Sequence, residues 1–299
     1  MAIESILGTT GADSLTATIK ADSVTSNLSK DFIVSGLAGN DTIKVLGSAS
    51  SFTVEGGLGA DTILFSADVT SAKTIQAGED NDTITFSKEL TSSSVYGGKG
   101  ADSILASGTV TGSKIAGSKG ADNLNIDGKV IDGSYIQGDE DDDTIDVSNR
   151  LDKSTVFGGK GEDSITVSNI IDTALVSGDL GDDSITISGT LNKDTVKGGS
   201  GADTVEVDAT AAGNASCDGG QDDDVLNIKS TAAFTLFGDK GDDRLDFTAA
   251  TASTGATLNG GVGDDTIDAV NNSSKGTYLG GTGDDSIFGG TADEKIYGG

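Results

Sequence analysis

Apolar and polar positions alternate in short runs that return at a nearly constant distance along the chain. Aliphatic residues such as Ile63, Ile84 and Ile104 are each followed by a polar or variable residue and then by another position that is usually apolar, such as Phe65 and Phe86. An alternation with a period of two predicts strands of four or five residues that bury one face. The pattern therefore predicts one short strand in each repeat.

A second short strand is predicted in each repeat, ending in a glycine-rich turn. Its inward position lies two residues before the glycines and is held by Val34, Val54, Ile75, Val95, Ile115, Ile136, Val156, Val176, Val196, Leu236 and Leu258. A third apolar row, which includes Val69, Leu90 and Val110, is expected to fill the opposite turn. Each repeat supplies too few inward side chains to be stable alone, but stacked repeats bury a continuous core. We therefore expect an all-β parallel β-solenoid of about 13 to 14 coils.

The turn between the two strands is a glycine-rich hexapeptide that ends in aspartate. After a first interval of 28 residues these anchor aspartates recur every 19 to 22 residues. Six of the hexapeptides read GGxGxD without deviation, and three others place Asp80, Asp141 and Asp222 where the fourth glycine is expected. Aspartate tolerates a left-handed backbone better than most residues. The anchors are Asp13, Asp41, Asp61, Asp82, Asp102, Asp122, Asp143, Asp163, Asp183, Asp203, Asp224, Asp243, Asp265 and Asp285.

The composition of this turn indicates a calcium site. Glycine adopts positive φ without steric cost, and a tight turn of this kind directs carbonyl oxygens towards a common point. Calcium takes six to eight hard oxygen ligands in flexible geometry, so carbonyls and one carboxylate from each of two successive loops can complete its shell. The expected carbonyl ligands are those of Gly57, Gly59, Gly98, Gly100, Gly159, Gly161, Gly199, Gly201, Gly261, Gly263, Gly281 and Gly283. Simple turn capping by the aspartates is the alternative.

Composition and charge narrow the classes of function. The 299 residues include no proline, tryptophan or histidine, and 48 acidic residues against 19 basic ones give a net charge of −29. So acidic a chain repels itself when compact, which favours bound cations and makes nucleic acid an unsuitable partner. Without histidine, and without a distinctive cluster of Asp, Glu, Lys or Arg outside the repeats, we expect no enzymatic activity. Zinc is disfavoured because the chain offers one cysteine and no histidine.

The repeated GGxGxDxU motif resembles the RTX (repeats-in-toxin) calcium-binding family, and the resemblance covers residues 8–299. It implies a right-handed β-roll, folding that waits for extracellular calcium, and type I secretion to the cell exterior or surface. The family repeat has nine residues, whereas one loop is found here in each 20-residue coil, which implies a single calcium column of about a dozen ions. A second-edge loop returns in GGTADEKIYGG, where Glu294 stands in the aspartate position.

The chain divides into residues 1–35, an N-terminal coil with an insertion that is a candidate cap, and residues 36–299, a continuous array of repeats. No cleavable leader and no transmembrane segment are expected near the N-terminus. The favoured function is a calcium-dependent extracellular structural protein that stacks head to tail into a fibre, surface layer or matrix. One alternative is the stalk or folding ratchet of a larger secreted adhesin, toxin or enzyme, and another is a module that binds ice or a similar lattice. A cell-surface glycan or lipopolysaccharide is a candidate partner.

Overall fold

The computed structural model describes residues 4–7, 11, 14–17, 32–72, 74–169, 171–209, 215–230, 234–249, 255–270, 272 and 275–299. Two compact units are found, Met1–Ser148 and Asn149–Gly299. Every regular element among the described residues is a β-strand. Within the same residues, no helix has the length and apolar character needed to span a membrane. The insertion expected around Lys20 to Lys30, and most of the candidate cap, lie outside the described residues.

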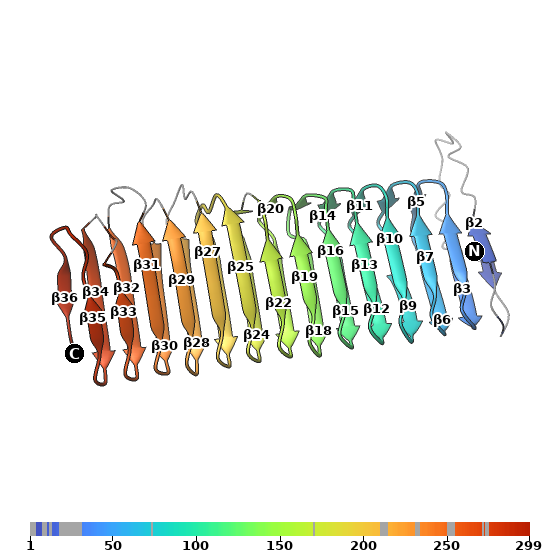
Figure 1. Ribbon diagram of the computed structural model, residues 1–299. Coiled ribbons are helices and arrows are strands. Elements are labelled where there is room, and N and C mark those ends of the chain that lie inside the picture. Colours follow the sequence, from blue (N-terminus) through green and yellow to red (C-terminus); the bar gives the residue numbers. More distant parts are fainter. Residues whose placement is uncertain are drawn as a thin grey trace. The chain divides into compact units, whose positions relative to one another are not determined.

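The first unit contains three sets of parallel strands (Figure 1). The first set is β1 (Glu4–Leu7), β3 (Phe32–Ala38), β6 (Phe52–Leu58), β9 (Thr74–Glu79), β12 (Ser94–Lys99), β15 (Lys114–Lys119) and β18 (Tyr135–Glu140). The second set is β2 (Ser14–Ala17), β4 (Thr42–Val45), β7 (Thr62–Phe65), β10 (Thr83–Phe86), β13 (Ser103–Ala106), β16 (Asn123–Ile126) and β19 (Thr144–Val147). A short third set is β5 (Ala49–Ser50), β8 (Val69–Thr70), β11 (Leu90–Thr91), β14 (Val110–Thr111) and β17 (Val130–Ile131).

The second unit repeats this arrangement. Its first set is β21 (Thr155–Lys160), β24 (Leu175–Leu180), β26 (Thr195–Ser200), β28 (Ala215–Gln221), β30 (Phe234–Lys240), β32 (Ala256–Val262), β34 (Gly276–Thr282) and β36 (Lys295–Tyr297). Its second set is β22 (Ser164–Val167), β25 (Ser184–Gly189), β27 (Thr204–Ala209), β29 (Val225–Ser230), β31 (Arg244–Ala249), β33 (Thr266–Asp268) and β35 (Ser286–Phe288). The third set is β20 (Leu151–Asp152) and β23 (Ile171–Asp172).

Parallel pairing places equivalent repeat positions side by side. Ile63 is paired with Ile84, and Ile84 with Ile104. This register puts one repeat directly on the next, so the prediction of an all-β parallel β-solenoid is confirmed. Among the described residues, the first set contains 15 strands and the second set contains 14.

The core consists of the inward rows that the alternation predicts. Ile63, Ile84 and Ile104 are fully buried, and the rings of Phe65 and Phe86 stack with their centroids 4.8 Å apart. The third apolar row is buried as well: Val69, Leu90, Val110, Val130, Leu151 and Leu191 are 0 to 1% exposed. Burying one such side chain contributes about 1.5–3 kcal/mol. Stacking thus gives each coil a core that a single repeat lacks.

Candidate metal centre

The anchor aspartates lie at the edge where each strand of the first set turns into a strand of the second. Asp61, for example, directly precedes β7, and Asp102 directly precedes β13. Twelve anchors are only 1 to 2% exposed: Asp41, Asp61, Asp82, Asp102, Asp122, Asp143, Asp163, Asp183, Asp203, Asp224, Asp243 and Asp265. Asp285 is partly buried, and Asp13 lies outside the described residues. Within each unit, the structure therefore brings the predicted aspartates into one column.

One oxygen of each anchor joins the coils by a hydrogen bond. The backbone N–H of Asp82 donates to Asp102 Oδ1 at 2.8 Å, and that of Asp102 donates to Asp122 Oδ1 at 2.7 Å. The same bond recurs through both units, at distances up to 3.0 Å. The carboxylate thus takes the place of a backbone acceptor between neighbouring loops.

At ten anchors the other carboxylate oxygen is buried without a partner among the described residues. Oδ2 has no hydrogen-bond partner among the described residues at Asp61, Asp82, Asp102, Asp122, Asp183, Asp203, Asp224, Asp243, Asp265 and Asp285. A buried polar atom with no partner costs about 1–3 kcal/mol, and a charged one costs more. Repeating this cost in coil after coil requires a compensating group, and a cation supplies it.

The first glycine of each hexapeptide leaves room beside that oxygen. A Cβ added at Gly97 would overlap Asp102 Oδ2 and would lie 2.7 Å from the carbonyl oxygen of Gly117 in the next coil. The same pair of oxygens, one from a carboxylate and one from a carbonyl, surrounds Gly56, Gly158, Gly198, Gly238, Gly260 and Gly280. Two hard oxygens from successive coils therefore converge on a space that only glycine leaves open. This arrangement fits calcium.

The carbonyls expected from the second and fourth glycines lie along the same column. Gly98 and Gly100 have φ values of +129° and +119°, and a Cβ at either would overlap a carbonyl of the preceding coil. Among the predicted carbonyls, those of Gly57, Gly100, Gly161, Gly199, Gly261, Gly263 and Gly281 lie against a glycine of the following coil. The ligand roles of all twelve predicted carbonyls remain predictions. Sequence analysis missed the first-position carbonyls, such as those of Ala77 and Gly117, which lie beside the unpartnered carboxylate oxygens.

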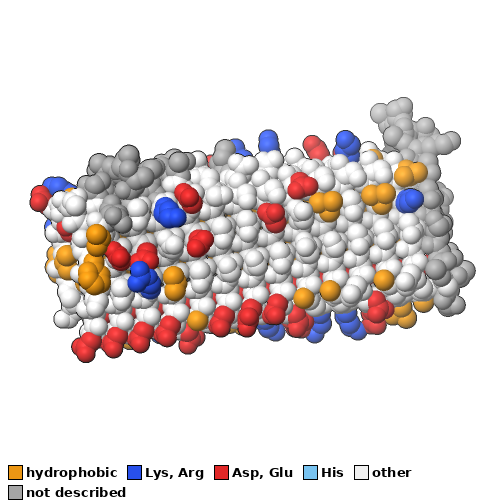
Figure 2. Space-filling model, viewed as in Figure 1, with side chains coloured by type: hydrophobic (Ala, Val, Ile, Leu, Met, Phe, Trp, Pro, Cys, Tyr) orange, Lys and Arg blue, Asp and Glu red, His pale blue; other side chains and the backbone are white. Residues whose placement is uncertain are grey.

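Aspartates in the fourth loop position have a different role from the anchors. Asp80, Asp141 and Asp222 have φ values of +77°, +78° and +75°, respectively, which confirms the expected left-handed backbone. Asp80 Oδ2 accepts a bond of 3.1 Å from the N–H of Gly59, and Asp141 Oδ2 accepts one of the same length from Gly120. Acidic side chains gather along this edge of each unit (Figure 2).

Burial raises the pKa of nine anchor carboxyls from the ordinary value of 3.8. The pKa is about 6 for Asp61, Asp102, Asp203 and Asp265, about 7 for Asp82, Asp122, Asp183 and Asp243, and about 8 for Asp224. Loss of hydration is the main cause, and the backbone hydrogen bond opposes it. Charges of nearby aspartates raise the pKa of all of these except Asp102 further. At neutral pH the column therefore favours either protons or a cation.

The ligands of a bound ion cannot all be side chains. In the part of the chain that the structure describes, no group of three or more His, Cys, Asp or Glu side chains is arranged to hold a metal. Carbonyl oxygens of the glycine-rich loops are the further hard ligands that the site offers beside the carboxylates. This donor set suits calcium better than magnesium, which usually keeps several waters.

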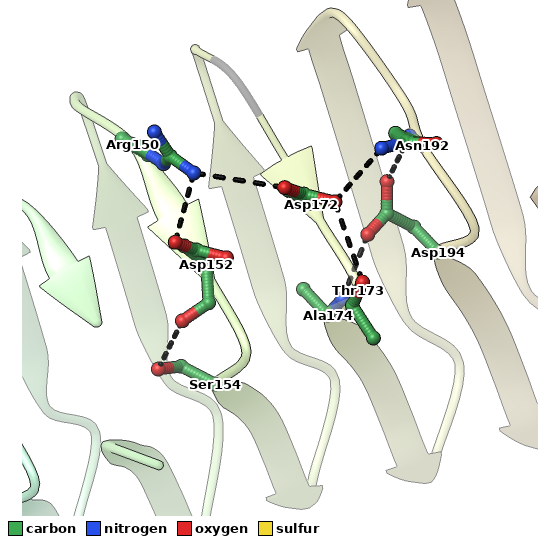
Figure 3. Close-up of polar contacts among 8 residues, drawn as sticks. All are labelled: Arg150, Asp152, Ser154, Asp172, Thr173, Ala174, Asn192 and Asp194. Carbon is green, nitrogen blue, oxygen red and sulfur yellow. Dashed lines mark hydrogen bonds and ion pairs between the residues drawn. The ribbon is translucent and has the colours of Figure 1, made fainter. Parts of the chain in front are cut away.

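At the opposite edge of the coils, the carboxylates of Asp172 and Asp194 have protein partners. Arg150 Nη2 lies 2.8 Å from Asp152 Oδ2 and 3.6 Å from Asp172 Oδ2, and Asn192 Nδ2 donates to Asp172 Oδ1 at 2.9 Å (Figure 3). Asp194 accepts from the N–H groups of Ala174 and Asn192 at 2.7 and 2.6 Å.

In the first unit, serine hydroxyl oxygens accept backbone N–H groups from the preceding coil at this edge. The N–H of Ala72 donates to Ser93 Oγ at 2.9 Å, and the N–H of Ser93 donates to Ser113 Oγ at 3.1 Å. Protein donors and hydroxyls therefore join the coils on this edge.

Comparison with known proteins agrees with this site. The model of the RTX calcium-binding nonapeptide repeat matches residues 7–43, 177–209, 254–269 and 275–299. No curated protein matches the chain significantly. A similar solved structure is a hyperactive, Ca²⁺-dependent, β-helical antifreeze protein from an Antarctic bacterium, with a TM-score of 0.57 and 23% identity over 92% of this chain and 83% of that one. The chain thus carries RTX calcium-binding nonapeptide repeats, folded as a β-solenoid with turns of about 20 residues.

Proposed function

We propose that this protein is an extracellular structural scaffold whose folding is coupled to calcium binding. The observation that carries the proposal is the column of buried Oδ2 atoms, ten of which have no partner among the described residues. Typical proteins are stable by only about 5–15 kcal/mol. Several buried carboxylates without partners cost an amount comparable to this whole margin. Folding therefore depends on the cation.

The chain's own residues prepare the site in three ways. The anchor Oδ1 fixes the carboxylate through the N–H of the preceding loop, so Oδ2 is held towards the space beside the first glycine. The first-position carbonyl of the next coil lies on the same space. The second and fourth glycines have positive φ, and their carbonyls lie along the same column. Bound calcium would supply positive charge that neutralises the carboxylates and links successive coils.

Calcium concentration provides the switch between the two states. Extracellular calcium modules often have dissociation constants of about 10⁻⁴ to 10⁻³ M, so the chain would fold outside a cell and remain unfolded inside. RTX repeats support secretion, and type I export is part of this proposal. Head-to-tail assembly into a fibre or surface layer, and a role as the stalk of a larger secreted protein, are the two structural uses of such a scaffold.

Circular dichroism during a calcium titration tests the coupling. We expect little sheet signal in chelator, a cooperative gain at about 0.1–10 mM calcium, and a much weaker response to magnesium. Full sheet content at micromolar calcium and pH 8 would contradict the proposal. Light scattering at saturating calcium then separates the two structural uses, because growth into long particles supports assembly and a constant monomer mass supports a stalk.

A second candidate function is the binding of ice or a similar lattice, and an outward row of hydroxyls favours it. Directly after the anchors, Thr62 is paired with Thr42 and Thr83, and Thr83 is paired with Ser103. The second unit continues with Ser164, Ser184 and Thr204 in register. Asn123, Val225 and Arg244 interrupt the row.

The similar structure is an antifreeze protein, which also supports this candidate. Thermal hysteresis of the calcium-loaded chain tests it. A hysteresis gap that Thr83→Leu reduces would favour ice binding, and freezing without any gap would exclude it.

A further inference from the structure

A groove of about 580 Å³ crosses the outward face of the first set of strands in the first unit. Its floor is made of small residues, because Gly78 is paired with Gly57 on one side and with Gly98 on the other, and Gly98 is paired with Ser118. Longer side chains line it, including Gln76 and Tyr96. Ligand sites have volumes of about 300–1,000 Å³, so this groove is large enough for a small ligand.

Tyr96 presents an aromatic ring to this groove. Lys114, on the next strand, places Nζ 5.3 Å from the centre of the Tyr96 ring and 5.8 Å from that of Tyr135. Thr74 and Gln76, on the preceding strand, line the groove together with Tyr96. The lysine therefore packs over the ring from one neighbouring coil, and the groove extends towards the other. A cation over an aromatic ring is attracted to the face of the ring, which helps to hold the Tyr96 side chain in place.

Charges at the loop side of the groove are paired in opposite signs. Lys99 Nζ forms an ion pair with Glu79 Oε1, and Lys119 Nζ lies 2.8 Å from Glu140 Oε2. Glu79, Lys99 and Lys119 line the groove together with a further carboxylate, that of Glu55. Because each lysine already has a carboxylate partner, the site has no excess of positive charge with which to hold an anion in this strongly acidic chain. The chemistry favours a neutral ligand rich in hydroxyl groups.

We propose that this groove binds a neutral oligosaccharide, with one sugar ring stacked on Tyr96. The apolar face of a pyranose packs on an aromatic ring, and the amide of Gln76 and the charged pairs both donate to and accept from sugar hydroxyls. The groove crosses four strands, β6, β9, β12 and β15, so a chain of several sugars can lie across the coils. This binding goes beyond the scaffold role, and its failure would leave the proposed calcium coupling intact.

Isothermal titration calorimetry of the calcium-saturated full chain tests the proposal with cellohexaose, maltohexaose and N-acetylchitohexaose as neutral probes. Polygalacturonate serves as the anionic probe. We expect at least one neutral probe to bind, and Tyr96→Ala to weaken that binding at least tenfold. Tyr135→Ala is the matched control, because Tyr135 lies on the other side of Lys114 and outside the groove, and we expect a change of less than twofold.

Three results would overturn the proposal. These are no binding of any neutral probe at 10 mM, binding of polygalacturonate alone, and equal losses in Tyr96→Ala and Tyr135→Ala. The calcium midpoint of folding, measured by circular dichroism, should be the same in both variants, so a loss of sugar binding is separated from a loss of folding. A Gln76→Ala variant provides a second reading, with an expected loss of at least threefold.

Discussion

Acid should partly replace calcium in folding this chain. Nine described anchors have a pKa of about 6 to 8 in the folded state, against an ordinary value of 3.8. Protonation removes the buried charge that calcium would otherwise neutralise. We therefore expect the chain to gain sheet structure in chelator when the pH falls from 8 to 5.

The sign and size of the pH effect on the unfolding free energy follow from the number of protons that the folded and unfolded chains bind. Because the folded-state pKa lies above the unfolded one, the folded chain binds more protons between about pH 4 and pH 8, and its unfolding free energy falls as the pH rises through this window. Near pH 6, the five anchors with a pKa of about 7 or 8 each hold nearly one extra proton: Asp82, Asp122, Asp183, Asp224 and Asp243. Five protons correspond to a slope of about 7 kcal/mol per pH unit, and the four anchors with a pKa of about 6 add about half a proton each. Partial hydration and screening reduce this slope. Even a slope of about 2–3 kcal/mol per pH unit would be a large fraction of the stability of a typical protein.

The assay is far-UV circular dichroism in 1 mM EGTA between pH 5 and pH 8.5, together with proton uptake measured by pH-stat during refolding. We expect a loss of sheet signal as the pH rises and an uptake of several protons on folding at pH 6. Saturating calcium provides the control, because protons then compete with the metal and lower pH should weaken the fold. A sheet signal in EGTA that is constant, or that grows with pH, would refute the account.

Three further perturbations test the site. Gly97→Ala places a methyl group against Asp102 Oδ2 and should destabilise the folded chain by about 1–3 kcal/mol. The calcium midpoint of folding, measured by circular dichroism, should therefore rise. Gly298→Ala is the control, because its Cβ meets no described atom within 4 Å, and it should leave the midpoint unchanged. Asp102→Asn keeps an acceptor at Oδ1 but removes the charge, so calorimetry should count fewer bound ions, and Tm in 10 mM calcium should fall by an amount equivalent to about 1–3 kcal/mol; an unchanged ion count would contradict its role. Cys217 is fully buried, and burial raises the pKa of its thiol, so a thiol reagent should label it in chelator but not in calcium, and equal labelling rates would contradict the coupling.

The sequence was sufficient to predict the solenoid because each inward position repeats at one offset from an anchor. Ile63 and Ile84 occupy equivalent positions, and parallel pairing of equivalent positions follows from stacking identical units. The column of anchors was predictable for the same reason. Periodicity alone could not show that the two oxygens of one carboxylate have different roles. That division follows from the distance between successive loops, which places the N–H of one anchor 2.7 to 3.0 Å from Oδ1 of the next.

Two features of the edges were missed because their sequence signal is ambiguous. Ser93 and Ser113 look like ordinary turn residues, yet each accepts a backbone N–H from the preceding coil while almost fully buried. Their recurrence two residues before the second inward position was the available signal. The carbonyls of Ala77 and Gly117 carry no side-chain signal, because any residue has a carbonyl. Only the backbone geometry shows that these two point towards an unpartnered carboxylate.

Anomalous diffraction from crystals grown in calcium would locate the ions that we place beside the anchor aspartates. We expect a row of calcium peaks along the loop edge of each unit, each about 2.3–2.6 Å from an anchor Oδ2 and from carbonyl oxygens of the adjoining loops. Asp102 Oδ2 and the carbonyl of Gly117 mark the place of one such peak. An ordered fold whose loop edge lacks calcium peaks, with Asp102 Oδ2 bound to water or to protein donors, would contradict the account.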